Sequence, residues 1–228
     1  MSASPADLLA RRVVPSAVIA LSRVTWPARA GAGLRRRLGR RGRVELFFAF
    51  DDPCSAIAVL DLSERLAGRR VRLLLLPVVQ RGIPGDPAVE LKRRYALQDA
   101  RRLARREGWA IARDEPLEPG EVAFVGEWAA ATPQGPALQR LCVAAMRRLW
   151  LEGAPVDREV FAALWREQLE APPPDDGGAA ARRDERLMRR RGPYDTPAAC
   201  VHGQWFFAHD RLAQIAERLD ELGWTAAQ

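Results

Sequence analysis

The chain has 228 residues, 48% of them apolar and 29% charged, which is the balance of a globular protein and excludes disorder throughout. The length is sufficient for one domain, alone or with a sizeable insertion. No uncharged apolar run approaches the roughly 18 residues that cross a bilayer, so we expect a soluble protein. Three cysteines without a Cys-x-x-Cys motif favour a reducing compartment, the cytoplasm, and two histidines without paired metal spacing predict no metal site.

The net charge of +7 is concentrated at one end of the chain. Residues 1–43 contain ten arginines and one acid, whereas the rest of the chain carries 26 basic and 28 acidic side chains. The body is therefore nearly neutral, and its composition does not indicate a nucleic-acid-binding fold. We interpret residues 1–43 as a basic Arg-rich arm, a solvated helix and linker ahead of the domain. Contact of this arm with an anionic surface such as a membrane or a nucleic acid, contact with a protein, and a targeting role are left open.

The first predicted elements form a βαβ unit over residues 44–79. Val44–Phe50 is rich in β-branched and aromatic residues, which indicates a buried strand. Asp52 is a suitable N-cap, and Pro53 fits the first position of a helix that runs to Gly68. Val71–Val79 is a nearly continuous apolar run, as expected for a second strand covered by helices on both faces.

Residues 80–191 contain little that indicates strands. Apolar stripes at helical spacing predict four helices, Pro87–Gly108, Pro136–Leu151, Asp157–Leu169 and Ala179–Arg191, while Val122–Ala131 is ambiguous between a strand and a helix. The pattern changes again over residues 192–222. It predicts a strand at Ala198–His202, a tight turn at Gly203-Gln204, a strand at Trp205–Phe207 and an amphipathic helix at Asp210–Leu222, followed by a tail over residues 223–228. The order predicts an α/β protein with a thioredoxin-like fold (β-α-β … β-β-α) and an inserted all-helical subdomain.

Three separated segments resemble one known family. They are FFAFDDPCSAIA at Phe47–Ala58, the pattern of Lys92, Tyr95, Asp99 and Arg102, and Thr196-Pro197 followed by Gly203, Trp205 and His209-Asp210-Arg211-Leu212. Together they resemble the DsbA-like thioredoxin-fold branch that contains 2-hydroxychromene-2-carboxylate isomerases and kappa-class glutathione transferases. The resemblance covers residues 44–222.

The resemblance implies a site between the first core helix and a cis peptide bond before Pro197. The start of a helix stabilises an anion, which in such proteins is a cysteine or glutathione thiolate. Glutathione is thus the implied cofactor, bound by Pro53, Thr196 and Pro197, with Asp210 at its γ-glutamyl end and His209 nearby. For Asp210 and His209, a helix cap and a surface residue are the alternative interpretations. The implied substrate is a small aromatic carboxylate.

The sequence departs from the family at the expected nucleophile. Asp52 stands at the position of the family's serine or cysteine, where its carboxylate would repel a thiolate. Asp52 as a plain N-cap is one interpretation. In the others, Cys54 in the first turn is an acidified single reactive thiol, or Ser55 donates to a thiolate placed deeper. A dithiol cycle is not supported, and we expect Cys142 and Cys200 to be core residues.

Lys92 is the only lysine among 36 basic side chains. A lysine is a compact point charge, and at this position it is a candidate to meet a substrate carboxylate or the glutathione backbone; a surface ion pair is the alternative. The resemblance therefore implies a glutathione-dependent isomerase or transferase. A non-catalytic thioredoxin-like binding module, a single-cysteine thiol oxidoreductase using Cys54, and a homodimer are left open.

Overall fold

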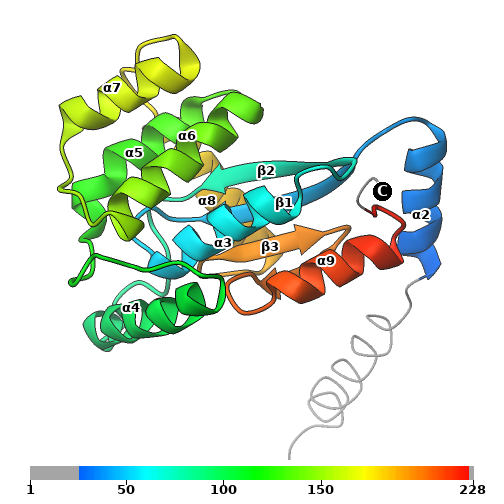
Figure 1. Ribbon diagram of the computed structural model, residues 1–228, viewed down its shortest axis with the longest axis horizontal. Coiled ribbons are helices and arrows are strands. Elements are labelled where there is room, and N and C mark those ends of the chain that lie inside the picture. The colour runs from blue at the N-terminus through cyan, green and yellow to red at the C-terminus, as the bar shows by residue number, and fades with distance from the viewer. Residues whose placement is uncertain (1–25, 226–228) are drawn as a thin grey trace, which may run out of the picture.

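A computed structural model of the protein describes residues 26–225 and is built around a four-stranded sheet with the strand order β2-β1-β3-β4 (Figure 1). The central strand β1 (Gly42–Phe48) pairs parallel with β2 (Val71–Pro77) and antiparallel with β3 (Ala198–Val201). A hairpin joins β3 to the edge strand β4 (Gln204–Phe207). The predicted βαβ and ββα halves thus meet in one sheet, which confirms the expected α/β fold class.

Helices cover both faces of the sheet. Figure 1 shows α3 (Pro53–Arg65) and α9 (Leu212–Glu221) on one face and α8 (Gly178–Arg191) behind the other. The inserted region supplies α4 (Val89–Arg106), α5 (Pro119–Ala131), α6 (Pro136–Met146), a π-helical turn at Arg147–Leu151, and α7 (Arg158–Leu169). None of the helices described within residues 26–225 is both long and apolar enough to span a membrane.

Alternation along β1 divides the core into two parts. Val44, Leu46 and Phe48 are fully buried in the large cluster that α3 and α9 complete, whereas Phe47 belongs to a smaller cluster with Met188 of α8. Neighbouring side chains of a strand point to opposite faces, so a strand covered on both sides is apolar at nearly every position. Burying each of these side chains stabilises the fold by about 1.5–3 kcal/mol.

Aromatic side chains pack the helices of the inserted subdomain together and attach the subdomain to the segment that follows β1. Within the subdomain, Phe124 and Trp128 of α5 pack edge to face against Phe161 and Trp165 of α7. The segment that was ambiguous, Val122–Ala131, is therefore helical, because its aromatic residues fall on one helix face. The buried indole N–H of Trp150 donates to the carbonyl of Phe50 at 3.0 Å, which fixes the chain just before the first core helix begins.

The β3–β4 turn differs from the expected one by one residue. The turn is formed by His202 and Gly203, and the following strand begins at Gln204 rather than Trp205. Both turn residues have positive φ, 48° and 87°, as the two-residue turn that matches strand twist requires. Glycine adopts this conformation easily, so Gly203 indicates a turn. It does not indicate whether the second turn residue is His202 before it or Gln204 after it.

The described part of the basic arm packs against the body, which corrects the expectation of a solvated helix. In α2 (Trp26–Arg37), Ala32 is completely buried in the large core cluster. Arg36 donates to the carbonyl of Leu222 and lies 5.5 Å from the ring centroid of Trp224. Residues 1–25 of the arm and 226–228 of the tail lie outside the described residues.

We predict that Gly177→Ala separates α5 from α8. A Cβ atom at this position would overlap the carbonyl oxygen of Glu127, which belongs to backbone and cannot rotate away. Overpacking of this kind costs about 1–3 kcal/mol of unfolding free energy, measurable by denaturant titration. The matched control is Gly120→Ala in α5, where a Cβ meets nothing within 4 Å; it should stabilise the helix by about 0.5–1 kcal/mol. Equal effects of the two substitutions would contradict the close approach.

Candidate functional site

The start of α3 meets the turn before β3, as the sequence predicted. The Thr196-Pro197 peptide bond is cis, and the Thr196 hydroxyl donates to Oδ2 of Asp52 at 3.3 Å. Both segments are buried, and Pro53 and Pro197 lie in this interior. The juxtaposition on which the predicted site depends is therefore present in the fold.

A cleft of about 500 Å³ opens beside this junction. Its lining comes mainly from the start of α3, the loop after β2, α4 and the segment that leads into β3. Pro119 at the start of α5 and His209 in the loop after β4 complete it. Five aspartates line it, against two arginines and one lysine; these charged residues are Asp51, Asp52, Asp86, Asp99, Asp195, Arg81, Arg93 and Lys92. Five carboxylates against three cations give the lining a net negative charge.

The carboxylate of Asp52 is the hydrogen-bonding centre of the junction. Oδ1 accepts the backbone N–H of Cys54 at 3.2 Å, and Oδ2 accepts that of Ser55 at 3.1 Å. Oδ2 also accepts the Ser55 hydroxyl at 2.5 Å. Asp52 is thus the N-cap of α3, a role that stabilises a helix by about 1 kcal/mol, and it occupies the donors that would otherwise hold an external anion.

Ser55 is not available as a donor to a ligand. Its hydroxyl gives its single proton to Asp52 and accepts the backbone N–H of Ala49 at 3.2 Å. The side chain is completely buried. The interpretation in which Ser55 donates to a thiolate is therefore not supported. Instead, the Ser55 hydroxyl holds the Asp52 carboxylate in place through its hydrogen bond.

Comparison with solved structures identifies the architecture. A 2-hydroxychromene-2-carboxylate isomerase superposes with a TM-score of 0.62 at 17% identity, covering 79% of this chain and 96% of that one. A probable DsbA oxidoreductase from Streptomyces coelicolor gives a TM-score of 0.60 at 15% identity, covering 82% and 92%. The cytosolic disulfide reductase DsbM from Pseudomonas aeruginosa, solved with GSH, gives 0.51 at 16% identity, covering 79% and 97%. The chain has the DsbA-like thioredoxin fold. No family profile and no curated protein matches its sequence.

Arg81 balances the carboxylates that line the cleft. Its Nε lies 3.2 Å from Oδ2 of Asp51, and its Nη1 lies 3.4 Å from Oδ1 of Asp195. Burial lowers the pKa of Arg81, but the charges of Asp52, Asp51 and Asp195 outweigh burial and raise it. Burial also raises the pKa of Asp51 above its ordinary value of 3.8, and Arg81 opposes that rise. The guanidinium therefore stays charged and permits several carboxylates to lie together.

Cys54 does not have the acidified thiol that its place in the first helical turn suggested. Burial raises the pKa of its thiol well above 9.0, and the charge of Asp52 raises it further. The thiol lies 3.7 Å from the carbonyl oxygen of Ala96 in α4, which covers it. The direction is opposite to the predicted one because burial and the negative charge of Asp52 both disfavour the thiolate. The other two cysteines are buried as expected.

Lys92 lines the cleft and is exposed over 63% of its side chain. Its ammonium pairs with Asp86, and that hydrogen bond raises the pKa of Lys92 and lowers the pKa of Asp86. Tyr95 and Asp99 of the same helix stripe also line the cleft, and Tyr95 is more than half exposed. Lys92 is thus beside the cleft, as predicted, in a surface ion pair.

The five residues implied for glutathione do not form one group. Pro53 and Pro197 are buried at the junction, and neither lines the cleft. Thr196 and His209 line the cleft, and Nδ1 of His209 is buried without a hydrogen-bond partner among residues 26–225. Asp210 lines a different pocket with Trp205 and Arg211, and α9 begins only at Leu212 with Arg211 at its N-cap. Asp210 is therefore neither the cap of the last helix nor part of the cleft.

Arg81 and Asp195 are among the charged residues of the cleft that were missed from the sequence. Arg81 and Asp195 each follow an element boundary in a loop, and their sequence neighbourhoods carry no motif. Asp195 also accepts the backbone N–H of Thr196 at 2.9 Å, so this donor beside the cis-proline is already occupied. The only available signal was their position: both lie next to segments that the resemblance already placed at the site. No cluster of potential ligands in the described part of the chain could hold a metal ion.

We predict that Arg81→Gln destabilises the protein by about 3 kcal/mol, because it leaves buried carboxylates without their cation. The loss should shrink as the pH falls from 7 toward 5. The folded-state pKa of Asp51 is already raised, and without Arg81 it rises further, so the folded state takes up protons that the unfolded state does not. Urea unfolding at several pH values measures both effects. Arg94→Gln, in an exposed pair with Glu90, is the control. A pH-independent loss would contradict this account.

We predict that the native protein resists alkylation. Iodoacetamide at neutral pH should modify Cys54 at least about tenfold more slowly than in the urea-unfolded chain, since its thiol is buried and its pKa is raised. Mass spectrometry after timed quenching follows each cysteine, and Cys142, which is fully buried, is the internal reference. Rapid modification of Cys54 alone would revive the single-cysteine oxidoreductase.

Proposed function

We propose that the cleft binds glutathione and that the protein is a glutathione-linked enzyme of the isomerase or transferase type, acting on a small aromatic acid without a dithiol cycle. The observation that carries the proposal is the cleft itself, formed where the start of α3 meets the cis Thr196-Pro197 turn. The solved fold neighbours include a 2-hydroxychromene-2-carboxylate isomerase and a DsbM structure with GSH, which supports this ligand class. A cytoplasmic location is part of the proposal.

The charges of the cleft favour a zwitterionic ligand. An acidic lining attracts an ammonium group, which the γ-glutamyl end of glutathione carries, and Asp99 and Asp195 are the candidates to receive it in place of Asp210. The carboxylates of the ligand require cations. Among the cations of the cleft, Lys92 is the most accessible. Its ion pair with Asp86 is weak, so the ammonium can leave Asp86 for a carboxylate of the ligand.

The aromatic acid would lie at the outer end of the cleft. Tyr95 and Tyr194 line this region and are exposed over 57% and 52% of their surfaces, so their rings are free to cover a planar substrate. Lys92 and Arg93 lie on the same helix as Tyr95, where they can meet a substrate carboxylate. Isomerisation of such a substrate requires proton movement, and His209 is the imidazole that lines the cleft.

Asp52 determines the state in which glutathione would bind. Two like charges about 4 Å apart near a protein surface repel each other by roughly 4 kcal/mol, so a thiolate beside Asp52 is disfavoured. A protonated thiol or a thioether avoids this repulsion, since neither carries the charge. The proposed ligand is therefore glutathione as its thiol or as an S-conjugate.

A second function is favoured by a specific observation. Both sets of donors that could hold an external ligand at the junction, the N–H groups at the start of α3 and the N–H of Thr196, are used by Asp52 and Asp195. Because these donors are already used, the junction supports a non-catalytic thioredoxin-like binding module, in which the cleft or the arm binds a protein partner or an anionic surface.

We predict that replacing Asp52 by serine removes the preference of the cleft for the protonated thiol of glutathione over its thiolate. Serine keeps an N-cap but removes the charge, so at about pH 9, where a cysteine thiol is largely ionised, Asp52→Ser should bind glutathione at least about tenfold more tightly than the native protein. Isothermal titration with glutathione and with S-methylglutathione, each at millimolar concentration, measures this. The gain should appear for glutathione only, because S-methylglutathione has no thiolate.

Asp114→Ser, which alters an aspartate exposed over 91% of its side chain, is the matched control and should leave both affinities unchanged. If neither peptide binds to the native protein or to Asp52→Ser, the glutathione proposal is wrong and the binding module remains. A parallel gain for both peptides would show that Asp52 acts by shape and not by charge.

A further inference from the structure

One half of the sheet face that carries α8 is left open. On this face α8 covers Phe47 and Leu76 through Met188, whereas Glu45 precedes them on β1 toward the start of the strand. The pairing register places Glu45 opposite Cys200, and Cys200 opposite Trp205 of the edge strand. These residues therefore form a continuous row across three strands, which α8 meets at its last residue, Arg191, through the ion pair with Glu45.

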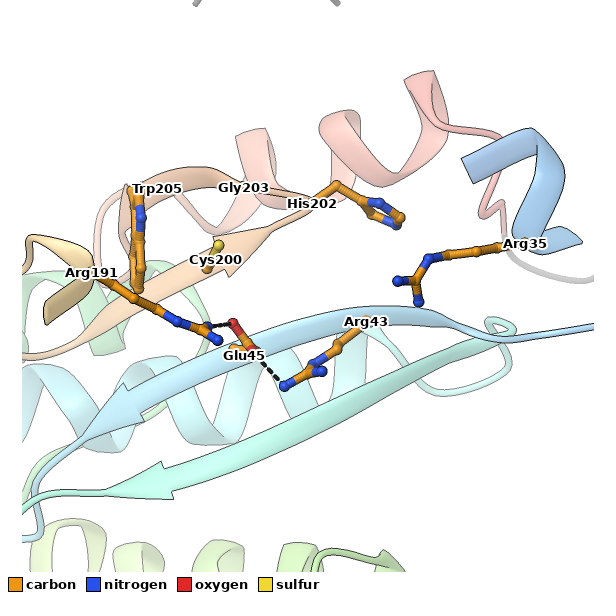
Figure 2. Close-up of a pocket in the computed structure, with 8 residues that line it drawn as sticks. All are labelled: Arg35, Arg43, Glu45, Arg191, Cys200, His202, Gly203 and Trp205. Atoms are coloured by element: carbon orange, nitrogen blue, oxygen red, sulfur yellow. Dashed lines mark hydrogen bonds and ion pairs between the residues drawn. The ribbon is translucent and has the colours of Figure 1, made fainter. Parts of the chain in front are cut away.

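A pocket of about 360 Å³ lies over this row, within the range of roughly 300–1,000 Å³ that small-molecule sites occupy. We call it the basic trough and define it by Arg35, Arg43, Glu45, Arg191, His202 and Trp205 (Figure 2). It lies at the start of β1, whereas the cleft described above follows the end of that strand. The two are separate sites.

The trough is positively charged although it contains a buried carboxylate. Glu45 is 6% exposed and pairs with both Arg43 and Arg191, so its one charge is shared between two guanidinium groups. Arg35 of α2 has no carboxylate partner among residues 26–225. A second hollow of about 440 Å³ continues from Arg35 and Arg43 and adds three more arginines, Arg40, Arg41 and Arg72.

The two ends of the trough differ in chemistry. In Figure 2, Trp205 stands at one end, while Arg35 and His202 extend toward each other at the other. The Trp205 ring packs against Phe47 with 5.9 Å between centroids, which fixes its position, and it remains partly exposed. An apolar hollow of about 260 Å³, lined by Tyr194 and Phe207, continues beyond Trp205.

We propose that the basic trough binds a nucleotide, with its phosphates at Arg35 and Arg43 and its base against Trp205. Guanidinium groups bind phosphate oxygens through paired charge-assisted hydrogen bonds, and an indole face stacks on any of the bases. A fixed aromatic ring lies at one end. At the other lie Arg35, which has no carboxylate partner among the described residues, and Arg43, which shares Glu45 with Arg191. This arrangement matches a ligand that carries a planar ring and an anionic group. The nucleotide is either free or one unit of a single strand.

His202 provides a built-in reporter of the bound anion. Burial lowers the pKa of His202, and the charges of Arg35 and Arg218, which face it from α2 and α9, lower it further. Its Nε2 is buried without a partner among the described residues. A phosphate beside Arg35 offsets that cation, so the pKa of His202 should rise on binding. The chain has only two histidines, and His209 lies in the other site.

The test uses the full chain and adenosine 5′-diphosphate at low salt, followed by isothermal titration. Arg35→Gln should weaken binding at least about tenfold, whereas Arg37→Gln, an exposed arginine of the same helix outside the trough, should change it less than about twofold. Inorganic pyrophosphate should bind at least about tenfold more weakly than the nucleotide, and Trp205→Leu should abolish this difference. Proton NMR should show the pKa of His202 rising with the nucleotide while that of His209 stays constant.

A single-stranded oligodeoxythymidylate of 12 nucleotides distinguishes the source of the nucleotide. Tighter binding of the oligonucleotide than of the free nucleotide, lost in Arg35→Gln and retained in Arg37→Gln, assigns the trough to a nucleic-acid strand; the reverse order assigns it to a free nucleotide. Equal losses in the two arginine variants would reveal diffuse attraction by the basic arm and overturn the proposal. So would the absence of binding by both ligands, or a constant pKa of His202 on binding.

Discussion

The buried carboxylate of Asp52 joins two parts of the chain that are 144 residues apart. It accepts the first N–H groups of α3 and the hydroxyls of Ser55 and Thr196, so that the start of the helix and the cis-proline turn share one acceptor. A buried carboxylate is costly unless hydrogen bonds and a cation compensate for lost water. Here the four donors and the nearby Arg81 provide that compensation, and the local arrangement of the cleft follows from it.

This interaction also affects the chemistry of the neighbouring cysteine. The start of a helix offers a limited number of N–H groups, and a side chain that accepts them excludes an external anion from the same place. Cys54 lies two residues further along the chain, yet burial raises the pKa of its thiol and the charge of Asp52 raises it further. One carboxylate thus stabilises the helix and suppresses thiolate chemistry beside it. What remains for a ligand is the outer cleft, with the exposed Lys92 and the tyrosines at its rim.

The parts of the structure that sequence reasoning predicted correctly are those determined by local patterns. The strand Val71–Pro77 and the capped start at Asp52 and Pro53 follow from residue types within a few positions of each other. The opposition of α3 and Pro197 was predicted only through the resemblance, since no local rule connects them. Errors arose where a distant segment decides the outcome. Cys54 is covered by α4 at Ala96, and α2 packs on the carboxyl-terminal residues, contacts that no neighbouring residue signals.

The site residues show the same division. His209 and Asp210 are adjacent in sequence, and the resemblance implied both for one ligand, yet the chain turns between them and they line different pockets. Arg81 and Asp195 lie 114 positions apart and form an ion pair at the cleft. No sequence pattern around either residue predicts this pair. Charge balance gives a retrospective reason: Asp51 and Asp52 are consecutive and buried, so a cation had to approach them from elsewhere. A pair of adjacent acids after a buried strand is therefore a signal that a distant basic partner exists, although not of its identity.

The distribution of charge separates the two ends of the central strand functionally. Beyond the end of β1 the cleft lining contains more aspartates than cations, whereas at the start of β1 the basic trough contains three arginines and one glutamate. Fields of opposite sign select ligands of opposite charge, so an anion attracted to the trough is disfavoured in the cleft. The buried strand between them is apolar, with Leu46, Phe47 and Phe48 completely inaccessible to water, and no ligand could pass through it. One sheet thereby presents two chemically distinct sites, and a ligand found at one site carries no information about the occupant of the other.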